Sequence, residues 1–221
     1  MKELRYTLLS DGSSDEALLP LLTWLLQAHL VECAIQPKWA DLRLLRKPPK
    51  TLSPRIIQSL KLYPCDLLFV HRDAEKEPRE VRVAEIVEAI EAAGESVSIP
   101  VVCVVPVRMQ EAWLLFDEVA LRRAAGNPRG REPLQLPLIA KLEQLPEPKN
   151  DLHELLREAS GLQRRRRKQF PVRERARRVA EFIYDFTPLH SLPAFQAREA
   201  ELEQVIQEQG WCYKSSEPEV K

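Results

Sequence analysis

Two short stretches of the chain are apolar at every position, residues 67–70 and residues 101–105. A strand that is buried on both faces of a parallel sheet has this pattern. Residues 6–9 form a third segment of extended character. A fourth and weaker strand is predicted over residues 31–39, where apolar and polar residues alternate but Pro37 interrupts them.

Between these segments, apolar residues recur at helical spacing. This spacing predicts helices over residues 13–29, 53–60 and 79–93. Ser13 and Glu16 have the spacing of a capping box, which predicts how the first of these helices starts. Strands therefore alternate with helices at least three times, as in a mostly parallel central sheet flanked by helices on both faces.

The second half of the chain is richer in proline and in helical patterns. After Glu111 we expect a helix whose packed face holds Ala112, Leu115, Phe116 and Val119. Further helices are expected over residues 138–145, 151–159, 175–186 and 196–209. We therefore predict an α/β domain over residues 1–125 and, packed on it, a helical C-terminal extension over residues 126–221 with a disordered tail from about residue 214.

Charge and cysteine content exclude several classes of protein. The 33 basic and 33 acidic residues balance, so the overall charge does not predict a general attraction to nucleic acid. The four cysteines are scattered without CxxC spacing, which favours free thiols in a reducing cytoplasm over a zinc site or a disulfide framework. No segment approaches the roughly twenty apolar residues of a membrane span, and no signal core is found. We expect a cytoplasmic protein with no membrane association.

Acidic residues follow three of the predicted strands. Asp11 follows the first strand, Asp73 and Glu75 follow the strand at residues 67–70, and Glu111 follows the strand at residues 101–105. Because the carboxyl ends of parallel strands lie along one edge of a sheet, we expect these carboxylates to converge there. Carboxylate oxygens suit Mg²⁺ or Mn²⁺, and the absence of Cys/His clusters disfavours zinc and copper. The alternative for each acid is an ordinary role in a polar loop or a first helical turn.

Short motifs in the same segments resemble a known family. The turn Ser-Asp-Gly-Ser-Ser-Asp-Glu at residues 10–16 is similar to the E-G-x-[ST]-[DE]-E turn of Toprim-type domains, and residues 69–75 are similar to their D-x-D strand end. A narrower resemblance is to DUF4276, an uncharacterised bacterial family that is Toprim-like. It rests on Val-Pro at residues 105–106, Gln-Glu-Ala-Trp-Leu-Leu at residues 110–115 and Leu-Pro-Ala-Phe at residues 192–195. The resemblance covers residues 4 to about 205.

The resemblance implies a Toprim-like fold and a Mg²⁺-dependent nuclease or related phosphodiester enzyme, acting in phage defence with an ATPase partner. Toprim domains use a glutamate as acid and base and aspartates as metal ligands. This implies catalytic roles for Asp11, His71 and Glu111, and metal binding by Asp11, Asp73, Glu75 and Glu111.

Two departures from the family pattern leave that set open. Asp11 stands where the family has Glu, and His71 stands at the first Asp of D-x-D. The metal is then held either by Asp73 together with Glu75, or by a set in which Glu111 is the substitute ligand. His71 is a general base, a residue that supports the ligands, or a structural histidine.

Basic residues suggest where a phosphate would bind. Arg72 and Arg108 flank the same edge and are predicted to hold a phosphate by bidentate hydrogen bonds, with pairing to nearby acids as the alternative. The run Arg164, Arg165, Arg166, Arg167 and Lys168 predicts contact with a nucleic-acid backbone, with a merely solvated surface as the alternative.

A second class of function also fits the sequence, namely a non-catalytic Toprim-like module for binding or regulation, because a fold does not fix a function. A receiver-type signalling domain is disfavoured because residues 106–108 supply no lysine at a later strand end. A nucleotide-cofactor enzyme is disfavoured because the chain has neither a G-x-G-x-x-G motif nor a P-loop.

Overall fold

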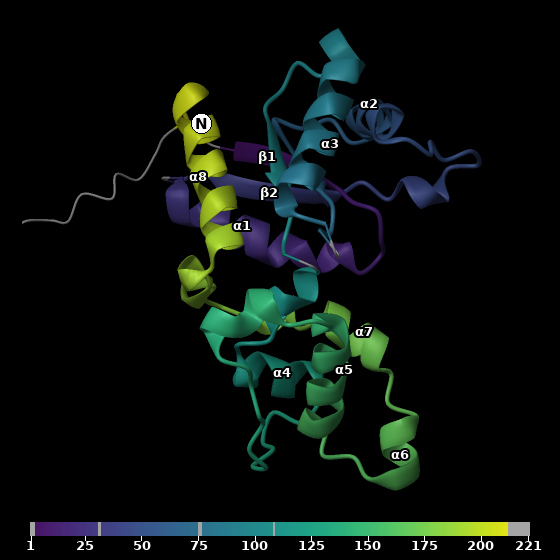
Figure 1. Cartoon of the computed structure of the whole chain (residues 1–221), viewed down its shortest axis with the longest axis vertical. Coiled ribbons are helices and arrows are strands. Elements are labelled where there is room, and N and C mark those ends of the chain that lie inside the picture. Colours follow the sequence, from purple (N-terminus) through teal and green to yellow (C-terminus); the bar gives the residue numbers. More distant parts are fainter. Residues whose placement is uncertain (1–2, 31, 75–76, 108, 212–221) are drawn as a thin grey trace, which may run out of the picture.

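The computed structural model describes residues 3–30, 32–74, 77–107 and 109–211, and its centre is a sheet of four parallel strands (Figure 1). The strands are β1 (Glu3–Leu9), β2 (Ala34–Trp39), β3 (Leu67–His71) and β4 (Val101–Val104), in the order β2-β1-β3-β4. This arrangement confirms the predicted α/β fold. The edge position of β2 accommodates Pro37, which has no N–H to donate to a neighbouring strand.

Helices cover both faces of this sheet. The α-helices of the described residues are α1 (Leu19–His29), α2 (Leu52–Leu62), α3 (Arg79–Ala93), α4 (Glu118–Ala124), α5 (Pro148–Ala159), α6 (Arg164–Lys168), α7 (Val172–Arg177) and α8 (Pro193–Glu208). The helices α1 and α8 share a core with Tyr6 and Phe69, while α2 and α3 share a core with Val70 and Cys103. Successive residues of β3 therefore enter opposite cores, which is why its whole length is buried.

The helices from α4 onward pack in two different places (Figure 1). The helices α4 to α7 gather below the sheet in that view, where α5 contacts the segment after β4 and α7 contacts the turn after β1. The last helix, α8, returns to the sheet and packs along β4. One apolar core therefore extends from Leu4 through Trp113 to Ile206, across the boundary that we predicted at residue 125.

The segment after β4 differs from the predicted helix. Residues Gln110–Leu114 form a 3₁₀ turn, and α4 begins only after Asp117. Asp117 caps this new helix, because its carboxylate accepts a hydrogen bond of 2.9 Å from the Ala120 N–H. Val119, which we expected on the packed face, consequently lies in the first turn of α4 and is 58% exposed.

The helix expected over residues 175–186 is also interrupted. The chain forms α7, then a 3₁₀ turn at Ala180–Phe182, and then the extended backbone of Ile183. Val179, Ala180 and Ile183 are buried as the helical pattern predicted. The apolar pattern therefore identified these three inward residues correctly, although they do not lie on one continuous helix.

The structure bears on two predictions about the cellular setting, namely the lack of a membrane span and the free cysteine thiols. Within the described ranges, no helix is both long enough and apolar enough to cross a membrane. Cys33, Cys65 and Cys103 are free thiols, and burial raises the pKa of the Cys103 thiol to about 12. The cytoplasmic location itself stays a prediction.

Candidate functional site

A small cavity lies at the carboxyl ends of β1 and β3 and has a volume of about 270 Å³. Its lining residues are Asp11, Gly12, Ser14, Asp15, His71, Arg72, Asp73 and Arg82. Two of the predicted metal ligands, Asp11 and Asp73, thus reach the same cavity from different strands. Glu75, another predicted ligand, lies outside the described residues, as does the predicted phosphate-binding Arg108.

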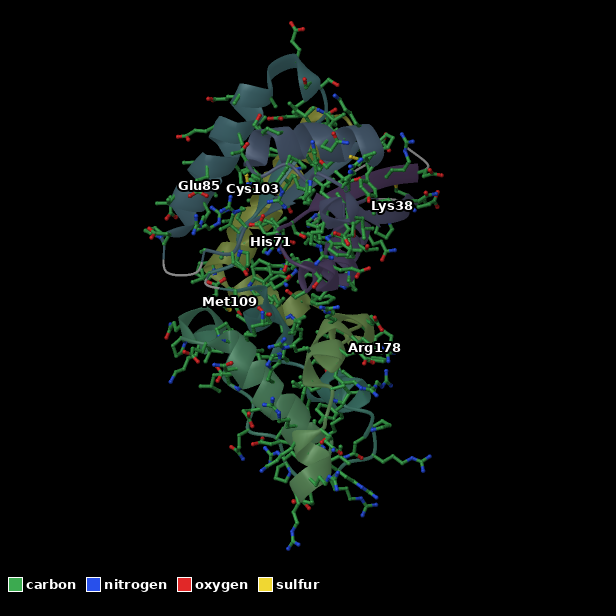
Figure 2. All side chains as sticks on the ribbon, turned by 90° about the vertical axis from the view of Figure 1, so that its right-hand side faces the viewer. Lys38, His71, Glu85, Cys103, Met109 and Arg178 are labelled. Carbon is green, nitrogen blue, oxygen red and sulfur yellow. The ribbon has the colours of Figure 1, made fainter. Side chains whose placement is uncertain are left out.

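His71 is the last residue of β3 and is only 2% exposed. Its Nδ1 lies 2.8 Å from the carbonyl oxygen of Val104 on the neighbouring strand, and a carbonyl can only accept, so Nδ1 carries the proton. The other ring nitrogen, Nε2, faces Asp73 Oδ1 at 3.5 Å and Asp15 Oδ2 at 3.9 Å. Figure 2 places His71 near the junction between the upper part of the molecule and the lower, helical part.

Asp73 sits in an environment that disfavours its charged form. Burial, with the negative charges of Glu111 and Asp15, raises the pKa of Asp73 to about 6, against the lowering influence of His71. The backbone N–H of Gln110 donates to Asp73 Oδ1 at 3.2 Å and fixes the orientation of this carboxylate. A cation bound beside Asp73 would relieve the accumulated negative charge, so this is the position at which a metal ion would be most favoured.

The sequence analysis missed Asp15, the most firmly held acid of the cavity. Asp15 is 5% exposed and accepts hydrogen bonds from the Gly12 N–H at 2.7 Å, from Ser14 Oγ at 3.0 Å and from Gln110 Nε2 at 2.9 Å. These bonds organise the turn after β1, and no side-chain cap of the predicted capping-box type is formed. The signal was present in the sequence, because Asp15 is in the same acid-rich turn as Asp11 and matches the second acidic position of the Toprim-type motif.

Asp11 has a different environment from the one that we predicted for a ligand. Its side chain is half exposed, and its two oxygens face Arg55 and, at 3.1 Å, Arg72 Nε. Arg72 in turn lies 3.5 Å from Glu85, so it follows the alternative that we gave for it, pairing with acids. Asp11 and Arg72 therefore form an ion-pair network at the rim of the cavity, while Asp15 takes the inner position beside His71.

The oxygen atoms of the inner residues fit a hard divalent cation. Asp15 and Asp73 offer carboxylate oxygens, and the side-chain oxygen Oε1 of Gln110 is buried without a hydrogen-bond partner. An unpaired buried acceptor next to carboxylates is the kind of atom that a metal ion or its water would satisfy. The ligand atoms of Asp15, His71 and Asp73 are spaced too widely for a closed ligand set, so a bound Mg²⁺ would need water molecules to complete its coordination.

A tighter group of possible ligands occurs elsewhere in the described residues. His29 at the end of α1 lies 2.9 Å from Glu199 and 3.4 Å from Glu203, both on α8. Glu199 also lies 3.0 Å from His190. These ion pairs join α1 and α8, the two helices on one face of the sheet, so a structural role accounts for them.

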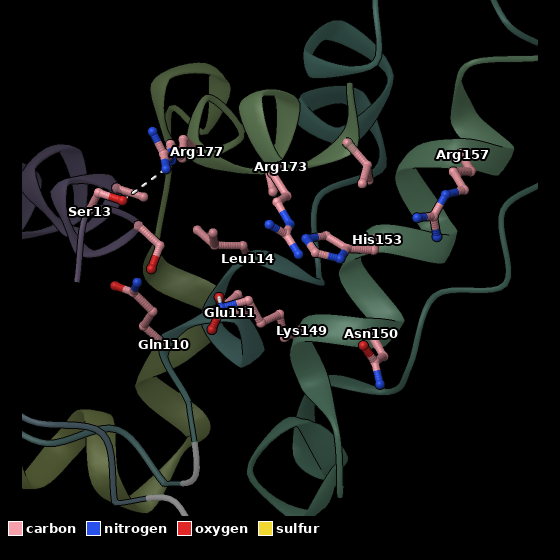
Figure 3. Close-up of a pocket in the computed structure, with 14 residues that line it drawn as sticks. Ser13, Gln110, Glu111, Leu114, Lys149, Asn150, His153, Arg157, Arg173 and Arg177 are labelled. Atoms are coloured by element: carbon pink, nitrogen blue, oxygen red, sulfur yellow. Dashed lines mark hydrogen bonds and ion pairs between the residues drawn. The ribbon is translucent and has the colours of Figure 1, made fainter. Parts of the chain in front are cut away.

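Glu111 faces a second and larger cavity of about 550 Å³, shown in Figure 3. Glu111 is 6% exposed, and Lys149 Nζ lies 3.6 Å from its Oε1. The basic residues that line this cavity are Lys149, His153, Arg157, Arg173 and Arg177. Ser14 lines both cavities, so the acidic and the basic cavity are neighbours.

The sequence analysis did not identify this basic cavity. It named instead the run from Arg164 to Lys168, which forms the short helix α6 at the bottom of the molecule in Figure 1, away from the strands. The residues of α6 are mostly exposed, and Arg167 lies 3.4 Å from Glu154. A signal for this cavity was present in the sequence, because Lys149, His153 and Arg157 recur every four residues along α5.

Comparison of the chain with models of protein families, with curated proteins and with solved structures finds no match. The resemblance to Toprim-like domains therefore stays a prediction from short motifs. The functional interpretation has to come from the geometry of the two cavities.

Proposed function

We propose that this protein is a phosphodiester hydrolase that depends on Mg²⁺ or Mn²⁺ and acts on nucleic acid. The observation that carries the proposal is the inner group at the carboxyl edge of a parallel sheet, in which Asp15 and His71 are buried and Asp73 is partly buried, beside a basic cavity. Ligand sites of open α/β sheets gather at this edge. Negative charge is concentrated where a cation would sit, and positive charge is available next to it for phosphate groups.

Each inner residue has a definite task under this proposal. A bound Mg²⁺ would supply activation of water and stabilisation of the phosphate oxygens. Asp15 and Asp73 would hold the ion, and the bonds from Gly12 and Gln110 keep these two carboxylates oriented. His71 presents Nε2 to the same space and can bind the ion or take a proton there, because its Nδ1 is engaged by Val104.

The finer parts of the proposal rest on the motif resemblance. Membership in the Toprim-like DUF4276 family, a role in phage defence and an ATPase partner are implied by the motifs at residues 10–16, 69–75 and 110–115. Glu111, to which the resemblance gives a catalytic role, lies close enough to raise the pKa of Asp73. Glu111 also lines the basic cavity, where Lys149 Nζ lies 3.6 Å from its Oε1.

The proposal is tested by cleavage of labelled single-stranded and double-stranded DNA and RNA with Mg²⁺, with Mn²⁺ and with EDTA. Asp73→Ala is compared with Asp66→Asn, a matched control because Asp66 immediately precedes β3 and pairs with Arg5 at the opposite end of that strand. We expect metal-dependent cleavage that is retained in Asp66→Asn and lost in Asp73→Ala. Cleavage that persists in Asp73→Ala would contradict the proposed site.

One observation favours a non-catalytic module as the second candidate. Asp11 occupies the motif position of the Toprim catalytic glutamate, and it is engaged by Arg55 and Arg72. A protein of this kind would bind its partner without turnover. Absence of metal binding at millimolar Mg²⁺ and Mn²⁺, measured by calorimetry, would favour it over the hydrolase.

A further inference from the structure

The larger cavity is formed by elements that are far apart in the sequence. One wall is α5, the opposite wall is α7, and the floor comes from the turn after β1 and the 3₁₀ turn after β4. Its volume of about 550 Å³ is within the range of sites that bind small molecules or single groups of a larger ligand. The cavity therefore has the size for one nucleotide with its phosphate.

Helical spacing directs basic side chains into the cavity from both walls. Lys149, His153 and Arg157 are four residues apart along α5, and Arg173 and Arg177 are four residues apart along α7. Residues four apart share one face of a helix. Figure 3 shows Arg173 and His153 close to each other in the middle of the cavity.

Several of these bases are available to a ligand. In the described part of the chain, the side chains of Arg173 and His153 make no ion pair or hydrogen bond. The side chain of Arg177 makes one hydrogen bond of 2.8 Å, to Ser13 Oγ. Burial and the positive charges of Arg157, Lys149 and Arg173 lower the pKa of His153. Lys149 is paired with Glu111, and Arg157 is paired with Glu154. Arg173 and Arg177 have no acidic partner in the described part of the chain, so a bound anion would be attracted to these two charges.

Apolar side chains complete the lining. Ala17, Leu114 and Val172 face the same cavity as the bases. A free inorganic anion would make no favourable contact with this apolar surface, whereas the sugar and base of a nucleotide would cover it. The gathering of four lysine and arginine side chains around one cavity also suits a dianionic phosphate monoester better than the single charge of an internal diester.

From this geometry we propose that the cavity between α5 and α7 binds the terminal phosphate of a nucleic-acid strand. The inference rests on the proposed function and extends it, since it makes the substrate a strand with a phosphorylated end. Ser14 belongs to both cavities, so a strand anchored by its end phosphate would place a nearby internal phosphodiester beside Asp73. The helical extension would then fix the distance between the strand end and the bond that is cleaved.

Binding is measured by fluorescence anisotropy in EDTA, so that catalysis plays no part. The probes are otherwise identical short single strands of DNA that carry a 5′-phosphate, a 3′-phosphate or no terminal phosphate. We expect one phosphorylated probe to bind about tenfold or more tightly than the probe without phosphate, since the contact adds charge-assisted hydrogen bonds. Equal binding of all three probes would overturn the inference.

Arg173→Ala tests the residues, with Arg129→Ala in the turn after α4 as the matched control. Both arginines are exposed, so neither substitution removes packing from the core, and thermal melting verifies folding. We expect Arg173→Ala to abolish the preference for the phosphorylated end and Arg129→Ala to preserve it. If both variants behave alike, the cavity is not the phosphate site.

Two further measurements separate the possible failures. Competition with a mononucleotide and with inorganic phosphate tests the source of the phosphate. If the competitor displaces the strand when both are present at the same concentration, the cavity binds a free nucleotide or phosphate instead of a strand end, and the inference is overturned. Cleavage of all three probes at the same rate would overturn the inference while leaving the hydrolase intact. End-dependent binding without any metal-dependent cleavage would overturn the hydrolase while leaving the phosphate site intact.

Discussion

The two neighbouring cavities carry opposite charges, and the protein holds the acidic groups more firmly than the basic groups. The acids Asp15 and Asp73 are held by backbone and side-chain hydrogen bonds at the ends of buried strands. The bases Arg173 and Arg177 stand on exposed helical surfaces and make few bonds within the protein. Fixed groups suit chemistry at a defined atom, whereas long unpaired side chains suit the recognition of a flexible polyanion. Under the proposed function, the sheet would position the reacting groups and the helical extension would bind the nucleic acid.

The largest effect that would test this division is loss of the proposed metal site. Asp73→Asn keeps the size of the side chain and the acceptor for the Gln110 N–H but removes the charge. We expect metal-dependent cleavage to fall by about 100-fold or more, the upper end of what changes near a metal ligand cause. Initial rates at saturating Mg²⁺ measure this effect. A loss of less than about threefold would place the ion elsewhere.

A buried charge without hydrogen-bond partners should reduce stability, and Arg198 on α8 is such a charge. Arg198 is fully buried, its three guanidinium nitrogens have no hydrogen-bond partner, and its head group lies 4.7 Å from the ring of Trp113 and 4.1 Å from that of Phe195. Burial lowers the pKa of Arg198 to about 9. We expect Arg198→Met to raise the free energy of unfolding by about 1–4 kcal/mol, measured by urea denaturation.

Arg198→Ala serves as the control for that measurement. It removes the same charge but leaves a cavity between Trp113 and Phe195, so we expect lower stability than in Arg198→Met. Destabilisation by Arg198→Met would show that the stacking on the two rings outweighs the burial of the charge.

The same reasoning gives a smaller effect at the acidic cavity. Since the pKa of folded Asp73 is raised to about 6, this group contributes stability below its unfolded value, and the contribution is lost as pH rises through about 6. Without metal at pH 7.5, Asp73→Asn should therefore be more stable than wild type by about 1–2 kcal/mol. Arg173→Ala, which removes an exposed charge, should change stability by less than about 0.5 kcal/mol.

Metal binding should reverse this pH dependence in the wild type. Mg²⁺ competes with the proton on Asp73, so the rise in melting temperature caused by Mg²⁺ should be small at pH 5 and should increase as pH passes through about 6. The rise should be absent in Asp73→Asn at every pH. A Mg²⁺ effect of equal size in the two proteins would mean that the ion binds elsewhere.

Local sequence was sufficient for the framework of this protein. The apolar runs at residues 67–70 and 101–105 are long enough to be buried on both faces and too short for helices, and these features predict central parallel strands. Strand direction then brings Asp11, Asp73 and the following segments to one edge, because the carboxyl ends of parallel strands lie together. For the same reason, convergence of residues about sixty apart in sequence was predictable.

Only the tertiary structure decided which acids face inward and where the basic groups gather. Asp11 and Asp15 lie in one turn, and contacts from distant segments separate them: Arg55 and Arg72 hold Asp11 at the rim, while Gln110 holds Asp15 inside. The basic cavity needs α5 and α7 to face each other across the ends of two strands. Such choices depend on the energies of long-range contacts, which no local pattern contains, whereas burial of an apolar strand depends mainly on its own residues.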